Sequence, residues 1–83
     1  MEFLFKDTAE NDLIYFGRNK PILKRIENLL KDIKQHPFTG IGKPEMLKEN
    51  LSGYWSRRID KEHRILYTVE NDSVTFYSFR GHY

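Results

Sequence analysis

The sequence has no cysteine among its 83 residues, which excludes a disulfide framework, a thiolate nucleophile and a cysteine-based zinc site. It has no apolar run approaching the roughly 20 residues that span a bilayer. The first residues show neither a basic segment nor a long apolar one, so we expect no signal peptide. From these absences we expect a cytoplasmic protein that makes no contact with membranes.

Several catalytic patterns are also missing. The three histidines are widely separated, and neither they nor the acidic residues are spaced to bind Zn²⁺ or Mg²⁺. Residues 40–43 have neither the length nor the final Ser or Thr of a phosphate-binding loop. No serine shows a Ser–His–Asp pattern for nucleophilic catalysis. We therefore predict no metal, no cofactor and no nucleophilic side chain.

Aromatic residues, in contrast, are unusually plentiful: six Phe, five Tyr and one Trp. Each can bury a large apolar area, so the composition is typical of a folded domain and not of a disordered chain. No linker, repeat or low-complexity segment divides the sequence. We expect residues 1–83 to form one domain with a modest core.

The formal net charge is only +2, but the basic residues are concentrated. Residues 40–64 carry six basic side chains against four acidic ones. Residues 77–83 add Arg80 and His82 without an acid. If these segments share a surface, that surface is positively charged, which suits a nucleic-acid partner.

The N-terminal half begins with a predicted strand and a predicted helix. Residues 2–5 are apolar enough for a strand. Asp7 followed by Glu10 resembles a capping box, which would begin the first helix. Gly17 would end that helix.

A second helix follows after a short turn. Asn19 and Pro21 favour its start, because Asn caps helices and Pro is tolerated in the first turn. Apolar residues then recur at helical spacing through residues 22–33, and Pro37 would end the helix. Two helices joined in this way predict a helical hairpin.

Beyond a loop at residues 38–44, the apolar period changes to two. Residues 54–59, 64–70 and 73–79 are rich in aromatic and β-branched residues, which favours strands, with a tight turn at 71–72. A short strand is expected near residues 45–47. The predicted fold class is α+β, with an N-terminal strand and a two-helix hairpin packed on an antiparallel sheet.

Strand alternation also assigns the two faces of residues 64–70. Ile65, Tyr67 and Val69 share one face, and that face is the better candidate for the core. Arg64 then lies on the face away from the helices. A permanently charged side chain at this position marks a candidate site.

The chemical groups that are present are Arg, Lys, Glu, His and Tyr, and these suffice for cleavage of RNA by its own 2′-hydroxyl. The substrate supplies the nucleophile, so the protein has only to orient it, move two protons and stabilise the phosphorane. Structural explanations are also open. Arg57 and Arg58 could form a solvated strand surface, and His63 could be a structural residue of a turn.

The sequence resembles the YoeB toxins of the RelE/ParE superfamily. The resemblance is carried by GKPEMLKENLSGYWSRRI at residues 42–59, KEHRILY at 61–67 and RGHY at 80–83. It covers the whole chain, although the helical half matches in pattern more than in identity. It implies a microbial-ribonuclease-like α+β fold and cleavage of messenger RNA in the ribosomal A site.

The resemblance also implies the roles of individual residues. By position, Glu45 would be the general base and His82 the general acid, and Arg64 would stabilise charge on the scissile phosphate. Lys48 and Arg58 would bind the phosphate or the neighbouring backbone.

The last residue, Tyr83, would help to shape the site. An extended tail would keep His82, two residues beyond Arg80, on the face of Arg58 if strand pairing continues. Gly81 is a departure, because a bulkier residue is expected there in the family, and glycine loosens the tail.

Partners follow from the same resemblance. The family implies the 70S ribosome with its mRNA, a YefM-like antitoxin whose C-terminal segment covers the basic surface, and a homodimer. Operator DNA would be bound only through the antitoxin. Two other hypotheses stay open: a non-catalytic ribosome or RNA binder that blocks translation by occupancy, and an interaction domain that captures an acidic peptide.

Overall fold

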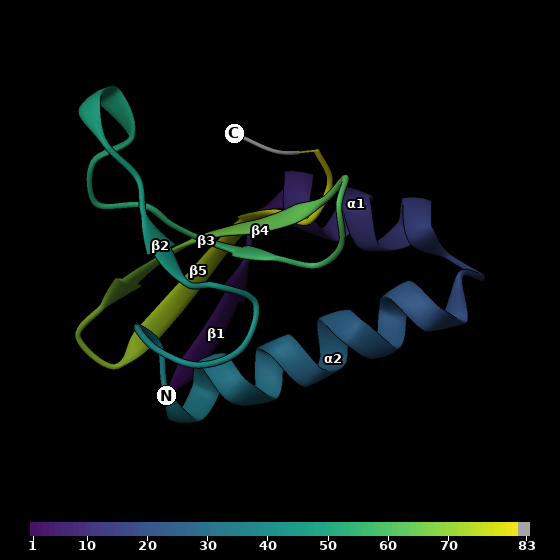
Figure 1. The fold of residues 1–83 in the computed structure, drawn as a ribbon, viewed down its shortest axis with the longest axis horizontal. Helices are drawn as coiled ribbons and strands as arrows, with labels where there is room; N and C mark the ends of the chain where they lie inside the picture. The colour runs from purple at the N-terminus through teal and green to yellow at the C-terminus, as the bar shows by residue number, and fades with distance from the viewer. Residues whose placement is uncertain (82–83) are drawn as a thin grey trace.

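The computed structural model describes residues 1–81 (Figure 1). The elements are, in chain order, β1 Glu2–Phe5, α1 Asp7–Phe16, α2 Lys20–Gln35, β2 Glu45–Met46, the 3₁₀-helix η1 Glu49–Leu51, β3 Trp55–Arg58, β4 Arg64–Glu70 and β5 Ser73–Ser78. The two helices pack on a five-stranded sheet, so the predicted α+β class is confirmed. No helix within residues 1–81 is long and apolar enough to cross a membrane.

The strand order across the sheet is β1-β5-β4-β3-β2. Each neighbouring pair from β2 to β5 is antiparallel, as predicted. β1 joins the far edge and runs parallel to β5, with Phe3 opposite Val74, so the whole sheet is mixed. A parallel pairing is possible here because the helical hairpin separates β1 from the remaining strands.

The start of α1 differs from the predicted capping box. Lys6, not Asp7, is the cap residue, and no side chain caps the helix. The Lys6 carbonyl accepts the Glu10 amide at 3.0 Å, while the Lys6 amide donates to Phe76 at 2.9 Å. β1 therefore passes directly into α1, and the acids lie in the first helical turn, where they favour the positive end of the helix dipole.

The start of α2 agrees with the prediction. The Asn19 side chain accepts the Ile22 amide at 3.2 Å, and Pro21 lies in the first turn. One face of the helix, comprising Ile22, Ile26, Leu29 and Ile33, is buried. These side chains form the main helical contribution to the core.

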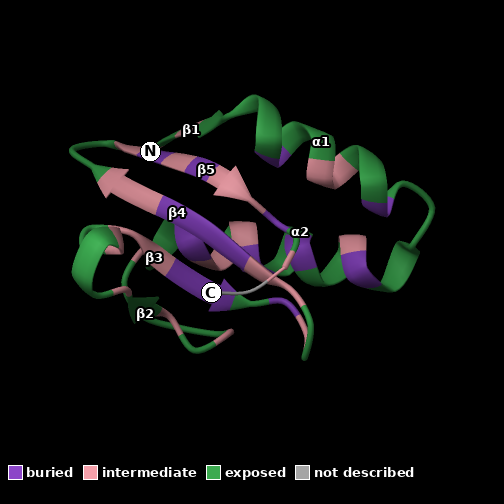
Figure 2. Ribbon diagram, turned by 90° about the horizontal axis from the view of Figure 1, so that it is seen from above, coloured by how far each residue is buried: buried purple, intermediate pink, exposed green. Residues whose placement is uncertain are grey.

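The core lies between the helices and one face of the sheet (Figure 2). From β4 it contains Ile65 and Tyr67, and from β5 Val74 and Phe76, each fully buried. The predicted inward face of β4 is therefore confirmed for these residues. Leu66, which alternates with them, is buried without joining this cluster.

Candidate functional site

Two arginines face each other across β3 and β4. Arg58 is the direct register partner of Arg64. Because Ile65 faces the helices, alternation directs Arg64 to the opposite face, and its cross-strand partner Arg58 lies there too. Arg58 is exposed and Arg64 is half-buried. Two like charges side by side repel each other, and an anion between them would relieve that repulsion, so the pair is suited to an anionic ligand.

Glu45 lies on the same face as the arginine pair. It is opposite Ser56 in the β2–β3 register, and Ser56 is two residues from Arg58 on the same strand. The period of two therefore brings Glu45, Arg58 and Arg64 to one face of three adjacent strands. Glu45 is exposed at the sheet edge.

Lys48 precedes η1 and is exposed. Figure 1 shows that the segment between β2 and β3 projects on the side of the sheet away from α2. Lys48 lies in this segment, three residues after Glu45.

The arginine pair lines a pocket of about 810 Å³. Its lining residues are Arg25, Arg58, Asp60, Lys61, Glu62 and Arg64, which are four cations and two carboxylates. Arg25 comes from α2, and the sequence had given no sign of it. Glu45 and Lys48 do not line this pocket, so the predicted site extends beyond it along the sheet.

Asp60 organises the turn beside the pocket. Its carboxylate accepts the amides of Glu62 at 2.8 Å and His63 at 2.7 Å. Burial alone would raise the pKa of Asp60, but these amides and the nearby charges of His63 and Arg25 outweigh it and lower the pKa below its usual value. The Asp60 charge is therefore largely engaged in holding the β3–β4 turn.

His63 is a structural residue, as one of the alternatives held. Its Nδ1 accepts the Gly81 amide at 2.9 Å, and its ring packs edge-on against Phe16 at a centroid distance of 5.1 Å.

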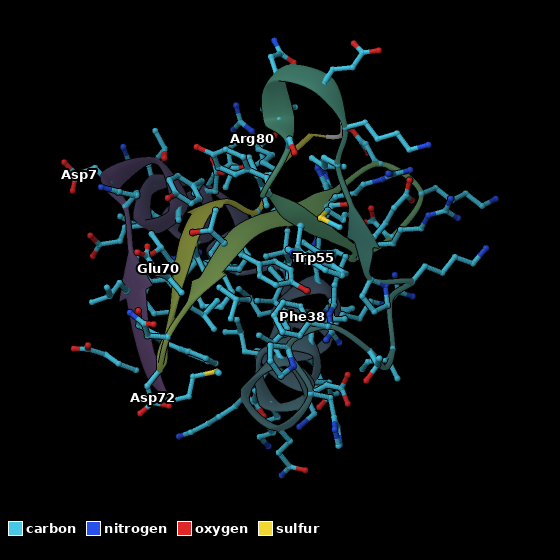
Figure 3. All side chains as sticks on the ribbon, turned by 90° about the vertical axis from the view of Figure 1, so that its left-hand side faces the viewer. Asp7, Phe38, Trp55, Glu70, Asp72 and Arg80 are labelled. Carbon is cyan, nitrogen blue, oxygen red and sulfur yellow. The ribbon has the colours of Figure 1, made fainter. Side chains whose placement is uncertain are left out.

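The segment after β5 is held at several points. The Phe79 amide donates to Asp12 at 2.9 Å, and the Arg80 guanidinium lies 4.0 Å above the Tyr15 ring (Figure 3 labels Arg80). The Gly81 carbonyl accepts the Arg64 amide at 2.8 Å, which brings residue 81 beside the arginine pair.

Strand pairing does not continue through residues 79–81. The position predicted for His82 depended on that continued pairing. β5 ends at Ser78, because the Phe79 amide turns to a side chain and Gly81 has a φ of +82°. This φ favours glycine, which explains the small residue at that position. His82 and Tyr83, the predicted acid and shaping residue, lie outside the described residues.

Arg57 contradicts the interpretation of a solvated strand surface, because it is 0% exposed. Its guanidinium donates to the Tyr67 hydroxyl at 3.1 Å and to the Asp32 carboxylate. Its remaining bonds reach the carbonyls of His36, Thr39 and Ile41. All five N–H donors are used within the protein.

This network fixes the loop between α2 and β2. The Arg57 guanidinium lowers the pKa of the Asp32 carboxyl, whereas burial raises the pKa of the Tyr67 hydroxyl. Beside it, the Trp55 ring packs against Phe38 of the loop at 5.0 Å (Figure 3). The loop ends at Pro44, directly before Glu45 begins β2.

Within residues 1–81, no group of three or more His, Asp or Glu side chains is arranged to hold a metal ion. The groups collected on this face are guanidinium, ammonium and carboxylate, which can bind a phosphate and exchange a proton.

Fold and surface together define a small α+β protein with a cationic sheet face, and comparison with known proteins identifies the family. The family described as "YoeB-like toxin of bacterial type II toxin-antitoxin system" matches residues 5–83. The YoeB toxin of Synechocystis is 50% identical over 84 residues, covering 100% of this chain and 98% of its own. The chain belongs to the YoeB family and is a toxin of a type II toxin–antitoxin system.

Solved structures agree with this assignment. A YoeB/ParE toxin from Agrobacterium tumefaciens superposes with a TM-score of 0.95 at 35% identity, with both chains fully covered. The toxin in a YoeB–YefM complex from Staphylococcus aureus gives 0.90 at 45% identity, and a YoeB dimer from that organism gives 0.91 at 44%. Both comparisons cover 100% of this chain and 98% of the other.

Proposed function

We propose that this toxin is a ribosome-dependent endoribonuclease that cleaves mRNA in the ribosomal A site and so inhibits translation. The observation that carries the proposal is the common face of Glu45, Arg58 and Arg64 on three adjacent strands. A carboxylate beside two permanently charged guanidinium groups is suited to deprotonating a hydroxyl next to a phosphodiester.

The proposed reaction is an attack of the RNA 2′-hydroxyl on the adjacent phosphorus. Glu45 accepts the hydroxyl proton as the O2′–P bond forms. The P–O5′ bond breaks, and His82 gives its proton to the departing 5′ oxygen. The products are a 5′-hydroxyl end and a cyclic phosphate, which can open to a 3′-phosphate. No metal or cofactor takes part in this proposal.

Arg64 has the largest electrostatic role in this scheme. Its guanidinium would stabilise the charge that develops on the phosphorane oxygens, while Arg58 and Lys48 hold the phosphate or its neighbouring backbone. Tyr83 would help to shape the site. Arg64→Ala should reduce cleavage on the order of 10²–10³-fold with ribosome binding retained. Equal loss of binding would make Arg64 a docking residue.

A non-catalytic ribosome binder is the second candidate, because the same cationic surface could block translation by occupancy. Glu45→Gln and His82→Gln distinguish the two functions, since each removes a proton-transfer group and keeps the side-chain size. If both variants still inhibit translation without cutting mRNA, occupancy is the function. Loss of inhibition together with cleavage supports the nuclease.

We also propose that a YefM-like antitoxin controls the toxin by covering the cationic face. Support comes from the S. aureus relative, which was solved as a YoeB–YefM complex, and from the excess of cations on this face. A homodimer is proposed from the dimeric S. aureus structure. Operator DNA would be bound through the antitoxin. Copurification with the antitoxin should abolish mRNA cleavage.

A further inference from the structure

The cationic pocket reaches beyond the residues that the proposed reaction uses. Arg58 and Arg64 lie on the sheet face away from the helices, yet Arg25, which lines the same pocket, comes from α2. A second hollow of about 220 Å³ has both Arg25 and Arg58 in its wall. The two arginines therefore meet at the end of the sheet, where the β3–β4 turn lies beside the helix.

The Arg25 guanidinium donates no hydrogen bond within residues 1–81. Within residues 1–81, the Arg25 side chain has only a Coulomb interaction, with Asp60. The Asp60 carboxylate is hydrogen-bonded to two backbone amides of its own turn. Glu62 is 80% exposed, and its carboxylate lies 3.8 Å from His63. Asp60 therefore attracts Arg25 toward the turn and leaves its N–H donors available.

The pocket is too large for the scissile phosphate alone. Its volume of about 810 Å³ lies within the range of roughly 300–1,000 Å³ that holds drug-sized ligands. Arg58 and Arg64 provide for one phosphate, and Arg25 with Lys61 adds two further cations to the same pocket. A continuous RNA strand presents its next phosphate a short distance from the first. Guanidinium groups hold such phosphates bidentately.

We infer that Arg25, assisted by Lys61, binds a phosphate adjacent to the scissile one on the same mRNA strand. This inference rests on the proposed nuclease function and adds a substrate-binding subsite to it. Arg25 holds the strand and takes no part in proton transfer. Its loss should weaken substrate binding and leave the chemical step unchanged.

The first test compares Arg25→Gln with Lys34→Gln on ribosomes carrying a defined mRNA. Both changes remove one charge from an exposed face of α2, but Lys34 lines an apolar groove away from the pocket. Arg25→Gln should raise KM on the order of tenfold, leave kcat unchanged and lower the salt dependence by about one ion. Lys34→Gln should leave both constants unchanged. A fall in kcat without a change in KM would overturn the inference.

The second test identifies the phosphate. An uncharged methylphosphonate replaces the mRNA linkage one position 5′ or 3′ of the cut. One of these substitutions should raise KM of the wild-type toxin about as much as Arg25→Gln does, and should have no further effect on that variant. If the methylphosphonate and Arg25→Gln raise KM additively at both positions, the inference is overturned and Arg25 contacts ribosomal RNA instead. If the wild-type toxin cuts no mRNA at all, it is the nuclease proposal that fails.

Discussion

Arg57 and Arg58 are consecutive residues of β3 with the same guanidinium group, but they lie on opposite faces of the sheet. Arg57 is fully buried and donates to Asp32, Tyr67 and three loop carbonyls. Arg58 is exposed, and within residues 1–81 its side chain has no hydrogen-bond partner. Strand alternation thus buries one of two identical residues in the fold and leaves the other with its N–H donors available to a ligand.

This division has an energetic basis. A buried guanidinium is tolerated only when all its donors are satisfied, and removing it leaves its partners buried without hydrogen bonds. An exposed guanidinium contributes little to stability but keeps its donors for a phosphate. Stability and activity should therefore respond separately to the two arginines.

The largest expected effect is the loss of stability in Arg57→Ala. Removing this side chain takes the ion-pair partner from Asp32, which keeps only the Ile41 amide, and leaves three loop carbonyls without this donor. The free energy of unfolding should therefore fall by about 3–5 kcal/mol. That is a large part of the 5–15 kcal/mol typical of a domain. Urea denaturation measures it, with Arg58→Ala as the matched control, expected within about 0.5 kcal/mol of wild type. Similar losses of unfolding free energy in both variants would show that Arg57 contributes no more to stability than Arg58 does.

Arg58→Ala should show the opposite pattern. Because this variant lacks the guanidinium group proposed to bind the phosphate, its cleavage of ribosome-bound mRNA should fall on the order of 10- to 100-fold. The measurement is the initial cleavage rate at fixed ribosome concentration, made alongside the unfolding free energy. A variant that is folded, stable and fully active would remove Arg58 from the site.

Two glycines with a positive φ, one beside Arg57 and one in open space, give a second pair of variants to compare. Gly42 has a φ of +80°, and an added Cβ would lie 2.7 Å from Leu29 and 3.0 Å from the Arg58 carbonyl oxygen. Gly53 has a φ of +95° with open space around it. Both substitutions to Ala carry the strain of a positive φ, about 1 kcal/mol. Gly42→Ala should cost about 1–3 kcal/mol more, because crowding adds to strain. Equal losses of unfolding free energy in the two variants, measured by urea denaturation, would show that the loop moves to make room for the added methyl group.

The smallest expected effect is a pH dependence of stability. Arg57 holds the pKa of the Asp32 carboxyl below its usual value. The ionised Asp32 therefore adds to the free energy of unfolding above a pH of about 4, and this stabilisation is lost as the pH falls through the folded-state pKa. Asp32→Asn should therefore flatten the decline in unfolding free energy at acid pH. The decline should not vanish, because the pKa of Asp60 is lowered too. Asp72→Asn, with a 94% exposed side chain, is the control.

The sequence predicts the parts of this molecule that depend on local pattern. The helix that begins after Asn19, the inward face of Ile65 and Tyr67 and the outward direction of Arg64 all follow from spacing, and the structure confirms them. The YoeB resemblance, now established as family membership, is carried by the motifs at residues 42–59, 61–67 and 80–83.

What the sequence could not predict depends on contacts between distant segments. Arg57 is buried because the loop after α2 folds back over β3, with partners 16 to 21 residues away in sequence. Arg25 reaches the cationic pocket only because of where α2 crosses the sheet. The failed capping box at Asp7 has a similar cause, since pairing of Lys6 with Phe76 brings the helix start one residue earlier.

The most direct test of the nuclease proposal removes the nucleophile from the substrate. An mRNA with a single 2′-deoxynucleotide at the mapped cut site is presented on translating ribosomes, beside the same mRNA with all hydroxyls intact. We expect the intact mRNA to be cut to a 5′-hydroxyl fragment and the deoxy mRNA to stay whole at that position. Cleavage of both at the same rate would contradict the nuclease proposal.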